Sequence, residues 1–391
     1  SSLATRVPDK LIAGRFCRPS LAGRTVQQYW FFWARLLLRI RKPLIVGVTG
    51  TAGKTTTVSM IGAVLERPDA ARVIGPAAHT VRNMNDDIGL PLTVMRYERW
   101  LNPPETLAAV LLLPFRTLAL ALSPRYPKVL VLEFGTHSEG HLHWLVKVAR
   151  PDIGVVTTIG PAHLDTLKTI AGVVHEKGAV VQAVPAAGLV VLGADHEHVA
   201  DLEALAKCRV IKLPGRGVEL AREIARAVGL HLGVSTQTIE AALASHRPEK
   251  GRLNLLQLGD LTVIDDHVNA NPLSMRLALD TLNELARPGQ RRVAMMGAML
   301  ELGEETVRYH EQLGAFARQR ADVVIGVGEL ARQFQPDRWF ASSPECADHV
   351  EEFLLPGDFL LVKGSSSIQM NLIVDRLRTR SDAGSPPGSP G

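Results

Sequence analysis

Short apolar runs alternate with longer segments of helical periodicity through most of this chain. The runs at residues 44–46, 129–132 and 153–157 are rich in β-branched side chains and contain no charge, which is typical of strands buried on both faces. Residues 189–192 and 209–211 continue the series. Apolar residues at helical spacing fill the intervals between these runs. The pattern predicts an α/β fold with a mostly parallel sheet and helices on both of its faces.

The pattern breaks at residues 246–251, where proline and glycine stand among charged side chains. A second α/β alternation follows, and it predicts a separate Rossmann-like domain. Its expected strands lie at residues 261–264, 292–296, 323–327 and 359–362. The expected organisation is a short leader with an aromatic helix at 1–42, a central domain at 43–248, a carboxyl-terminal domain at 249–380 and a disordered Ser/Pro/Gly-rich tail at 381–391.

The residues that follow the first strand have the layout of a phosphate-binding loop. The stretch from Gly47 to Thr57 reads strand, glycine-rich turn, Gly-Lys-Thr and helix. Backbone N–H groups and the positive helix end would hold an anion, Lys54 would reach terminal phosphates, and Thr55 would offer its hydroxyl to Mg²⁺. Val48 occupies the place of the usual first glycine, so an ordinary βα turn is the alternative. The residues expected to hold the nucleotide are Gly50, Thr51, Ala52, Gly53, Lys54, Thr55 and Thr56.

Composition narrows the class of protein. Of 391 residues 46% are hydrophobic and 21% charged, as in an ordinary globular protein, and the formal net charge is +5. This charge suits anionic small molecules, and no basic run with interleaved aromatics points to nucleic acid. The three cysteines, Cys17, Cys208 and Cys346, form no CxxC pair, so a disulfide framework and a cysteine zinc site are excluded. With no secretory signal at the start, we expect a reducing, cytoplasmic location.

Two apolar stretches, at 29–40 and 107–122, allow two interpretations. Arginines interrupt the first, and Pro114 and Arg116 interrupt the second. Both are shorter than the roughly 20 apolar residues that a membrane span requires, so packed helices are expected. For both stretches, lying on a membrane surface or in a dimer contact is the alternative, and the 29–40 helix is the candidate for contact with a membrane surface or another protein.

Candidate metal ligands follow two of the predicted strands. Glu133 stands at the end of one strand, at the sheet edge where ligands bind in open parallel sheets, and is placed to hold Mg²⁺. The alternative is a capping or surface glutamate. His163 also follows a strand. Alone it would be structural, but beside Glu133 and the loop it becomes a second metal-ligand candidate. Lys177, taken alone, reads as a solvated helix lysine.

A polar loop in the second half is the other candidate binding segment. Residues 264–272 run from a strand through two aspartates and two asparagines to a proline. Aspartate can accept hydrogen bonds from ribose hydroxyls, and Arg252 can neutralise a phosphate. The alternative is an Asx turn that caps a helix beginning near Pro272.

Together these motifs resemble the Mur ligases, and most of all their MurF branch, from about residue 44 to about residue 377. Besides the loop, the matching segments are 132–135, 150–153, 159–164, 251–254, 264–272, 299–304 and 362–365. Members of the MurF branch join D-alanyl-D-alanine to a UDP-linked muramoyl tripeptide in peptidoglycan precursor synthesis. The resemblance implies an ATP-dependent, ADP-forming ligase that activates a small-molecule carboxylate as an acyl phosphate for attack by an amine.

The resemblance also implies a role for each matching residue. Lys54 and Thr55 would serve phosphate and the first of two Mg²⁺ ions, and Glu133 and His163 would hold metal. Lys177 matches a lysine that the family often carbamylates to make a metal-binding carbamate. The remaining assignments are Arg252 to the γ-phosphate, Asp266 to the ribose, Asn269 and Asn271 to the nucleotide, and Lys363 and Ser365 to the amine substrate.

Departures from the family pattern concern the substrate pockets. Only about 42 residues precede the central domain, where MurF proteins have a UDP-sugar domain. Val268, Ala298 and Ser366 replace a tyrosine, an aspartate and an arginine, and residues 193–196 read Gly-Ala-Asp-His in place of Asn-Ala-Asp-Asp. Two alternatives therefore stay open. One is a Mur-type ligase for a capsule, cofactor or natural-product carboxylate, and the other is a non-catalytic, nucleotide-binding partner subunit.

Overall fold

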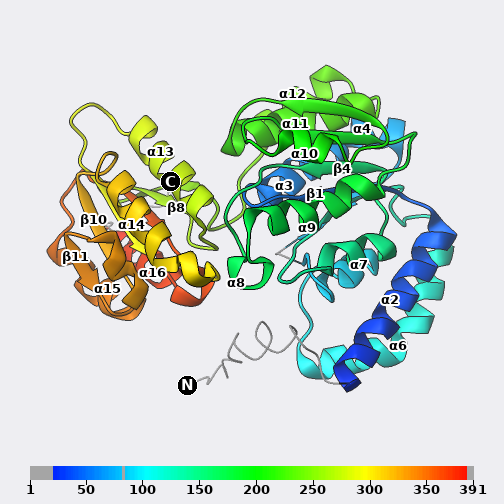
Figure 1. Cartoon of the computed structure of the whole chain (residues 1–391), viewed down its shortest axis with the longest axis horizontal. Helices are drawn as coiled ribbons and strands as arrows, with labels where there is room; N and C mark the ends of the chain where they lie inside the picture. The colour runs from blue at the N-terminus through cyan, green and yellow to red at the C-terminus, as the bar shows by residue number, and fades with distance from the viewer. Residues whose placement is uncertain (1–20, 82–83, 385–391) are drawn as a thin grey trace, which may run out of the picture. The chain divides into compact units, whose positions relative to one another are not determined.

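The computed structural model describes residues 21–81 and 84–384, which form two compact units (Figure 1). The first unit holds the described residues up to 159 together with 171–246. The second holds 160–170 and the residues from 247 onward, so a short segment that the sequence places in the central domain groups with the second unit. Each unit carries one six-stranded sheet, and the predicted α/β class is confirmed.

All strands of the first sheet run parallel. Their order is β2 (Ala77–His79), β3 (Val129–Glu133), β1 (Leu44–Thr49), β4 (Ile153–Val156), β5 (Leu189–Gly193) and β6 (Arg209–Leu213). From β1 the chain passes to β2 and β3 on one side, and after β3 it crosses to β4, β5 and β6 on the other side, so the direction of the strand order reverses at β1. Ligands of open α/β sheets bind beyond the carboxyl ends of strands at such a point. The sequence pattern missed β2, because its three residues have no β-branched side chain.

The helices of this unit cover both faces of its sheet. α11 (Gly217–His231) packs on α3 (Lys54–Leu65), and the two bury Val58, Ile61 and Ile224 against the strands. Along β3 the side chains alternate between two cores, with Val129 and Val131 on one face and Leu130 and Leu132 on the other, as a strand buried on both faces requires. The other helices are α4 (Pro68–Ile74), α5 (Gly89–Val94), α7 (His141–Val148), α9 (Ile170–Ala183), α10 (Val199–Glu203) and α12 (Thr236–Ser245).

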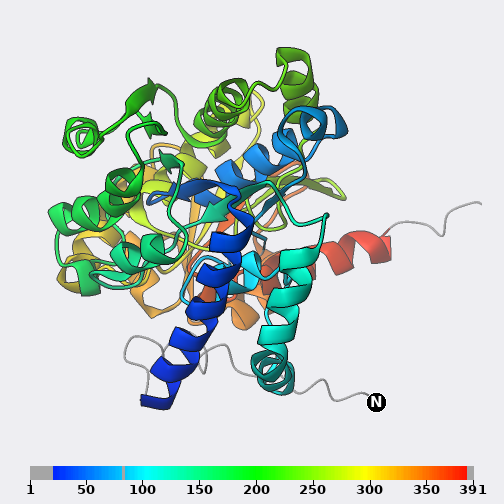
Figure 2. The same ribbon diagram turned by 90° about the vertical axis from the view of Figure 1, so that its right-hand side faces the viewer.

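Two long helices lie side by side at one end of the first unit (Figure 2). They are α2 (Leu21–Arg41) and α6 (Pro103–Leu122), both longer than the apolar stretches that predicted them. Trp30 and Leu37 of α2 are fully buried with Leu113 of α6. The guanidinium of Arg41 donates to the Ala121 carbonyl oxygen at 3.1 Å. The packed-helix interpretation of residues 29–40 therefore holds for α2. Residues 1–20 of the expected leader, with Cys17, lie outside the described residues.

The second sheet has the order β11 (Arg338–Phe340), β10 (Val323–Val327), β9 (Arg292–Gly297), β12 (Phe359–Lys363), β8 (Leu261–Asp265) and β7 (Asn254–Leu258). Only the β7–β8 pair is antiparallel among these strands. The helices are α8 (Leu164–Leu167), α13 (Pro272–Leu285), α14 (Thr306–Ala317), α15 (Ser343–His349) and α16 (Asn371–Gly384), with 3₁₀ turns at Gly303–Glu305, Glu329–Phe334, Val350–Glu352 and Ser366–Ile368.

Three expectations for the second unit need correction. The sequence pattern missed β7 and β11, because both lie at sheet edges and neither has the continuous apolar run of a buried strand. α16 continues to Gly384, into the segment that was expected to be disordered from residue 381. Residues 385–391 lie outside the described residues.

If α2 is part of the core of the first unit, truncation of its buried face will destabilise the protein. Leu37→Ala should lower the free energy of unfolding by about 2–5 kcal/mol, because it leaves a cavity against α6. Phe32→Ala on the same helix is the control, since that ring is 58% exposed and its loss should cost less than about 1 kcal/mol. Urea unfolding measures both. Equal effects would show that α2 does not pack as described.

Candidate functional site

In the loop between β1 and α3, the backbone at Gly50 has a conformation and surroundings that only glycine fits. Gly50 has φ of +148°, and a Cβ placed there would lie 1.9 Å from Oγ1 of Thr157. Gly53, with φ of +81°, precedes α3 in the left-handed conformation. α3 begins at Lys54, so the amino end of the helix opens directly onto the loop. This is the predicted strand, loop and helix arrangement, and it can present N–H groups and a positive helix end to a phosphate.

Two threonines at the end of β4 hold the loop in place. Thr51 N–H donates to the Thr158 carbonyl oxygen at 2.8 Å, and Ala52 N–H donates to Thr158 Oγ1 at 3.2 Å. Thr157 Oγ1 donates to the Ala52 carbonyl oxygen at 2.6 Å. Sequence reasoning assigned no role to this pair. The available signal was their position at the carboxyl end of the strand next to β1.

Two lysines meet at one carbonyl oxygen of the loop. The Nζ atoms of Lys54 and Lys177 each donate to the Gly50 oxygen at 2.9 Å. Lys177 is 2% exposed, so the reading of this side chain as a solvated helix lysine is wrong. Burial, and then the positive charge of Lys54, hold the pKa of Lys177 well below its ordinary value, although Glu176 and Glu133 oppose the shift. Burial therefore disfavours the protonated form of Lys177 in the folded protein.

Two buried carboxylates complete this part of the first unit. Glu133 is 2% exposed, and its Oε1 accepts from Nδ2 of Asn85 at 2.7 Å. Its place on β3, opposite Val48 in the sheet register, brings it beside the strand that leads into the loop. Glu176 accepts hydrogen bonds from the backbone N–H groups of Gly140, at 2.7 Å, and Leu142. It therefore caps α7, whose helix dipole stabilises the charge.

The first unit thus brings together most of the predicted loop and metal residues. Thr55 is buried at the start of α3, which follows β1, and Glu133 is the last residue of β3, so both lie at the carboxyl ends of these strands. Lys177 reaches the same loop from α9. Hydroxyl and carboxylate oxygens are the ligands that Mg²⁺ prefers, so this donor set fits that ion. Asn85 and Glu176 were missed by sequence reasoning. Glu176 could have been noticed from its position next to Lys177.

In the second unit, residues that were predicted for different tasks form one ion pair. Nζ of Lys363 donates to Oδ2 of Asp266 at 2.6 Å and to the carbonyl oxygen of Asn269 at 2.8 Å. Oδ1 of Asp266 accepts from the N–H of Leu253 at 3.2 Å. Lys363 is buried, and this pair ties the end of β12 to the loop after β8. Sequence reasoning placed Asp266 at a ribose and Lys363 at an amine, and it did not predict their contact.

The two asparagines of the polar loop bond to the local backbone. Oδ1 of Asn271 accepts from the N–H of Ser274 at 2.9 Å, in a capping box at the start of α13. Oδ1 of Asn269 accepts from the N–H of Ala270 at 2.8 Å. The helix begins at Pro272 as predicted. The contacts seen are those of the capping alternative, while a nucleotide role for either side chain stays a prediction.

His163 and Ser365 each contact the segment that follows β9. Nδ1 of His163 lies 2.6 Å from Oε2 of Glu301, and His163 has φ of +54° where it precedes α8. Oγ of Ser365 accepts from the N–H of Leu300 at 3.1 Å. His310 holds the same segment, because its Nε2 accepts from the N–H of Met299 at 3.0 Å. Burial lowers the pKa of His310, which keeps it neutral for that bond.

Arg252 lies in the second unit, on the turn just before β7. Its N–H donates to the Glu249 carbonyl oxygen at 3.1 Å. The preceding Gly251 has φ of +75°, and a Cβ there would lie 2.6 Å from Cε1 of His267. His267 in turn pairs with the buried carboxylate of Asp265. The described turn therefore has a close-packed backbone, with Arg252 half-buried on it.

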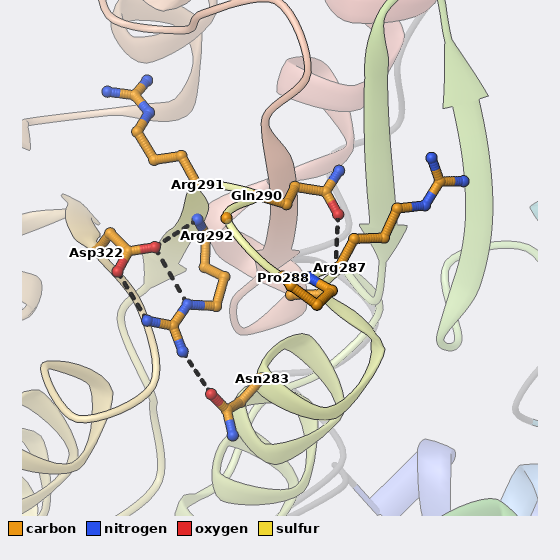
Figure 3. Close-up of a pocket in the computed structure, with 9 residues that line it drawn as sticks. Asn283, Arg287, Pro288, Gln290, Arg291, Arg292 and Asp322 are labelled. Atoms are coloured by element: carbon orange, nitrogen blue, oxygen red, sulfur yellow. Dashed lines mark hydrogen bonds and ion pairs between the residues drawn. The ribbon is translucent and has the colours of Figure 1, made fainter.

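A hollow of about 520 Å³ in the second unit lies away from the predicted residues (Figure 3). It is lined by residues 283, 286–292 and 322, at the amino ends of β9 and β10. Arg292 fills its side by donating to Asp322 and to Asn283, as the dashed lines show (Figure 3). β12 runs parallel to β9 and carries Lys363 at its carboxyl end. The hollow, at the amino end of β9, and the Lys363–Asp266 pair therefore lie at opposite ends of the strands.

The first α/β unit carries a phosphate-binding loop, and the second carries an ion-paired lysine at the carboxyl ends of its strands. This combination is that of a nucleotide-dependent enzyme. Comparison with protein families identifies the class. The Mur ligase middle domain matches residues 48–108 and 113–253, which is more than half of the chain. The Mur ligase glutamate ligase domain matches residues 251–366. The chain belongs to the Mur ligase family.

Individual relatives point to one branch of the family. The chain is 29% identical, over 87% of its length and 74% of the relative's, to the UDP-N-acetylmuramoyl-tripeptide--D-alanyl-D-alanine ligase of Mycobacterium tuberculosis. It is 26% identical, over 88% and 78%, to the protein of that name from Escherichia coli. The solved MurF ligase of Thermotoga maritima in complex with ADP is 20% identical, covers 92% of this chain and 85% of its own, and has a TM-score of 0.76. At that identity the likeness shows a shared fold.

The lowered pKa of Lys177 makes stability depend on pH in a defined direction. Between the lowered pKa and its ordinary value of 10.5, the unfolded state binds the proton that the folded state has lost. Stability should therefore rise with pH across that window and become level above it. Lys177→Met should remove this contribution and stabilise the protein near neutral pH, because no amine then has to give up its proton on folding.

Urea unfolding of wild type and of Lys177→Met measures the effect at several pH values between about 7 and 10, a range that lies below the ordinary pKa of lysine. Lys147→Met, on the exposed face of α7, is the matched control and should leave the slope unchanged. The account of Lys177 is wrong if the Lys177→Met difference does not vary with pH.

Proposed function

We propose that this protein is an ATP-dependent, ADP-forming ligase that joins a carboxylate to an amine; its relatives are named as ligases, and one was solved in complex with ADP. The observation that carries the proposal is the loop of the first unit. There, Lys54 and the buried Lys177 meet at the Gly50 carbonyl oxygen, with Glu133 at the end of the neighbouring strand. A non-catalytic nucleotide-binding subunit would have no use for the buried amine of Lys177, whose burial costs folding free energy.

The chemistry begins with a carboxylate that is a poor electrophile. Its oxygen attacks the γ-phosphorus of ATP, the bond to the bridging oxygen breaks, and ADP leaves with the electron pair. The acyl phosphate that results is attacked by a neutral amine, inorganic phosphate leaves, and the amine nitrogen loses one proton. Lys54 and the N–H groups at the start of α3 would offset the charge on the transferring phosphoryl group, where preorganised donors are most effective.

We propose that Mg²⁺ is held by Thr55, Glu133 and a modified Lys177, and His163 of the second unit stays a predicted metal ligand. A divalent ion would supply electrostatic stabilisation of the phosphoryl oxygens. The lowered pKa of Lys177 supports the modification, because only an uncharged amine can attack carbon dioxide and a lower pKa increases the uncharged fraction. The new N–C bond and loss of one proton would give a carbamate, which turns a donor into an anionic oxygen ligand. Asn85 would hold Glu133 in orientation through its bond to Oε1.

For substrates, we propose a UDP-linked muramoyl tripeptide and D-alanyl-D-alanine, the molecules in the names of the relatives, and with them a role in peptidoglycan precursor synthesis in the cytoplasm. Arg252, Asp266, Asn269 and Asn271 would serve the nucleotide, and Lys363 and Ser365 the amine substrate. The Lys363–Asp266 pair and the bond from Leu300 to Ser365 support this, because they fix the positions of these side chains before a ligand arrives. Ala298 and Ser366 replace charged residues of the family pattern. The N–H of Ser365 donates to the Ala298 carbonyl oxygen, and Ser366 follows Ser365 in the sequence.

Removal of the loop lysine tests the proposal. Lys54→Ala should lower the rate of ADP formation with both substrates on the order of 10²- to 10³-fold, because one charge that stabilises the transferring phosphoryl group is lost. Coupled ADP release measures it. Lys147→Ala, an exposed lysine of the same unit, should stay near the wild-type rate. The assignment fails if Lys54→Ala keeps its rate, or if wild type makes no amide from any carboxylate and amine in a panel that includes these two.

The carbamate has a test that does not depend on turnover. Isotopically labelled bicarbonate should give one carbamate carbon resonance in wild type, and Lys177→Ala should remove it. The variant should also lose ligase activity and regain part of it with added acetate, whose carboxylate can replace the missing ligand. A wild-type spectrum without the resonance, together with full activity of Lys177→Ala, would rule the modification out.

A further inference from the structure

The outward face of α6 is apolar along most of its length. Its members recur at three- and four-residue intervals, so they form one stripe along the helix, about 22 Å long at 1.5 Å per residue. Each is between 57% and 74% exposed. We call this surface the α6 stripe, and its residues are Leu107, Leu111, Leu112, Phe115, Leu118 and Leu122. An apolar surface of this extent marks a site of contact with a partner or a membrane.

The other face of α6 is fixed to the first unit. Leu113 and Thr117 are buried toward α2 and the neighbouring segments. The guanidinium of Arg116 donates to the carbonyl oxygens of Met95 and Arg96 at 2.8 and 2.9 Å and covers the ring of Tyr97. The single charge within the helix beyond its first turn is therefore turned away from the stripe and held there.

This attachment distinguishes lying on a membrane from crossing one. By length and composition, Pro104–Leu122 is the one helix among the described residues that could cross a bilayer. A spanning helix would have to expose the Arg116 guanidinium and the Thr117 hydroxyl to hydrocarbon and give up its contacts with α2. With only one face free, α6 fits a helix that lies in the plane of the interface.

Charge identifies the kind of surface. Residues 21–42 and 106–128, which include α2 and most of α6, contain eight arginines and lysines and no aspartate or glutamate. The two helices have their carboxyl ends together, since Arg41 bonds to Ala121. Near those ends Arg39, Lys42, Arg125 and Lys128 are exposed. A second copy of this chain would bring like charges together across the contact, whereas an anionic lipid surface would attract them.

We propose that the α6 stripe docks this protein on an anionic lipid surface. The leucines and Phe115 enter the boundary between headgroups and acyl chains, and the basic residues at the carboxyl ends of α2 and α6 contact lipid phosphates. Phe32 and Ile40 of α2 are also exposed and add apolar surface to this pair of helices. The attachment is peripheral and reversible, because one apolar stripe is far weaker than a spanning helix.

Vesicle flotation of the full chain tests the proposal. Wild type should float with vesicles of phosphatidylcholine and phosphatidylglycerol, less with phosphatidylcholine alone, and less as salt is raised, since screening weakens the basic contacts. Leu111→Gln with Leu118→Gln should weaken partitioning roughly tenfold or more, because two apolar side chains no longer enter the lipid. Arg39→Gln with Arg125→Gln should reduce the preference for phosphatidylglycerol.

Val73→Gln with Leu230→Gln is the matched control, because these side chains are 61% and 49% exposed elsewhere in the first unit. The control should float as wild type does. Circular dichroism and thermal unfolding check that all the variants stay folded. The proposal is overturned if wild type does not float, if the α6 double variant floats as well as wild type, or if sedimentation shows a dimer that only the α6 substitutions dissociate. In the last case the stripe is a contact between copies.

Discussion

Burial of an amine beside a phosphate loop is the constraint on which the first unit depends. Lys177 reaches the Gly50 carbonyl oxygen from α9, the same atom that Lys54 reaches from α3. Two ammonium groups on one oxygen would repel each other, and the lowered pKa of Lys177 relieves this. Thr157 leaves no room for a side chain at Gly50, whose carbonyl oxygen accepts from both lysines. Loop geometry and amine chemistry are thus parts of one arrangement.

Much of the fold was predictable because buried parallel strands leave an unambiguous signal. The central strands of both sheets are continuous apolar runs, and their order of appearance gave the α/β class. What failed were β2, β7 and β11, which lie at or near sheet edges, are short or face solvent on one side, and so carry no such run. The assignment of residues 160–170 to the second unit also has no local signal, since it depends on contacts distant in sequence, such as Asp165 with Glu301.

The candidate site was predictable to the extent that motifs carry it. The loop from Gly50 to Thr56 and the strand-end position of Glu133 follow from spacing alone, whereas Lys177 was expected to be solvated until the family resemblance pointed elsewhere. The contacts that orient these residues, Asn85 to Glu133 and Lys363 to Asp266, join segments far apart in the chain, and no spacing rule reveals such pairs. The same holds for the α6 stripe, whose exposure depends on which face α2 covers.

The central claim is that the chain forms an amide through an acyl phosphate. The most direct test uses a carboxylate substrate that carries heavy oxygen in its carboxyl group, with ATP and the amine, and mass analysis of the inorganic phosphate released. The account predicts that each phosphate formed with the amide contains one oxygen atom from the carboxylate, because that oxygen bonds to phosphorus before the amine displaces it. Unlabelled phosphate accompanying amide formation would contradict the account.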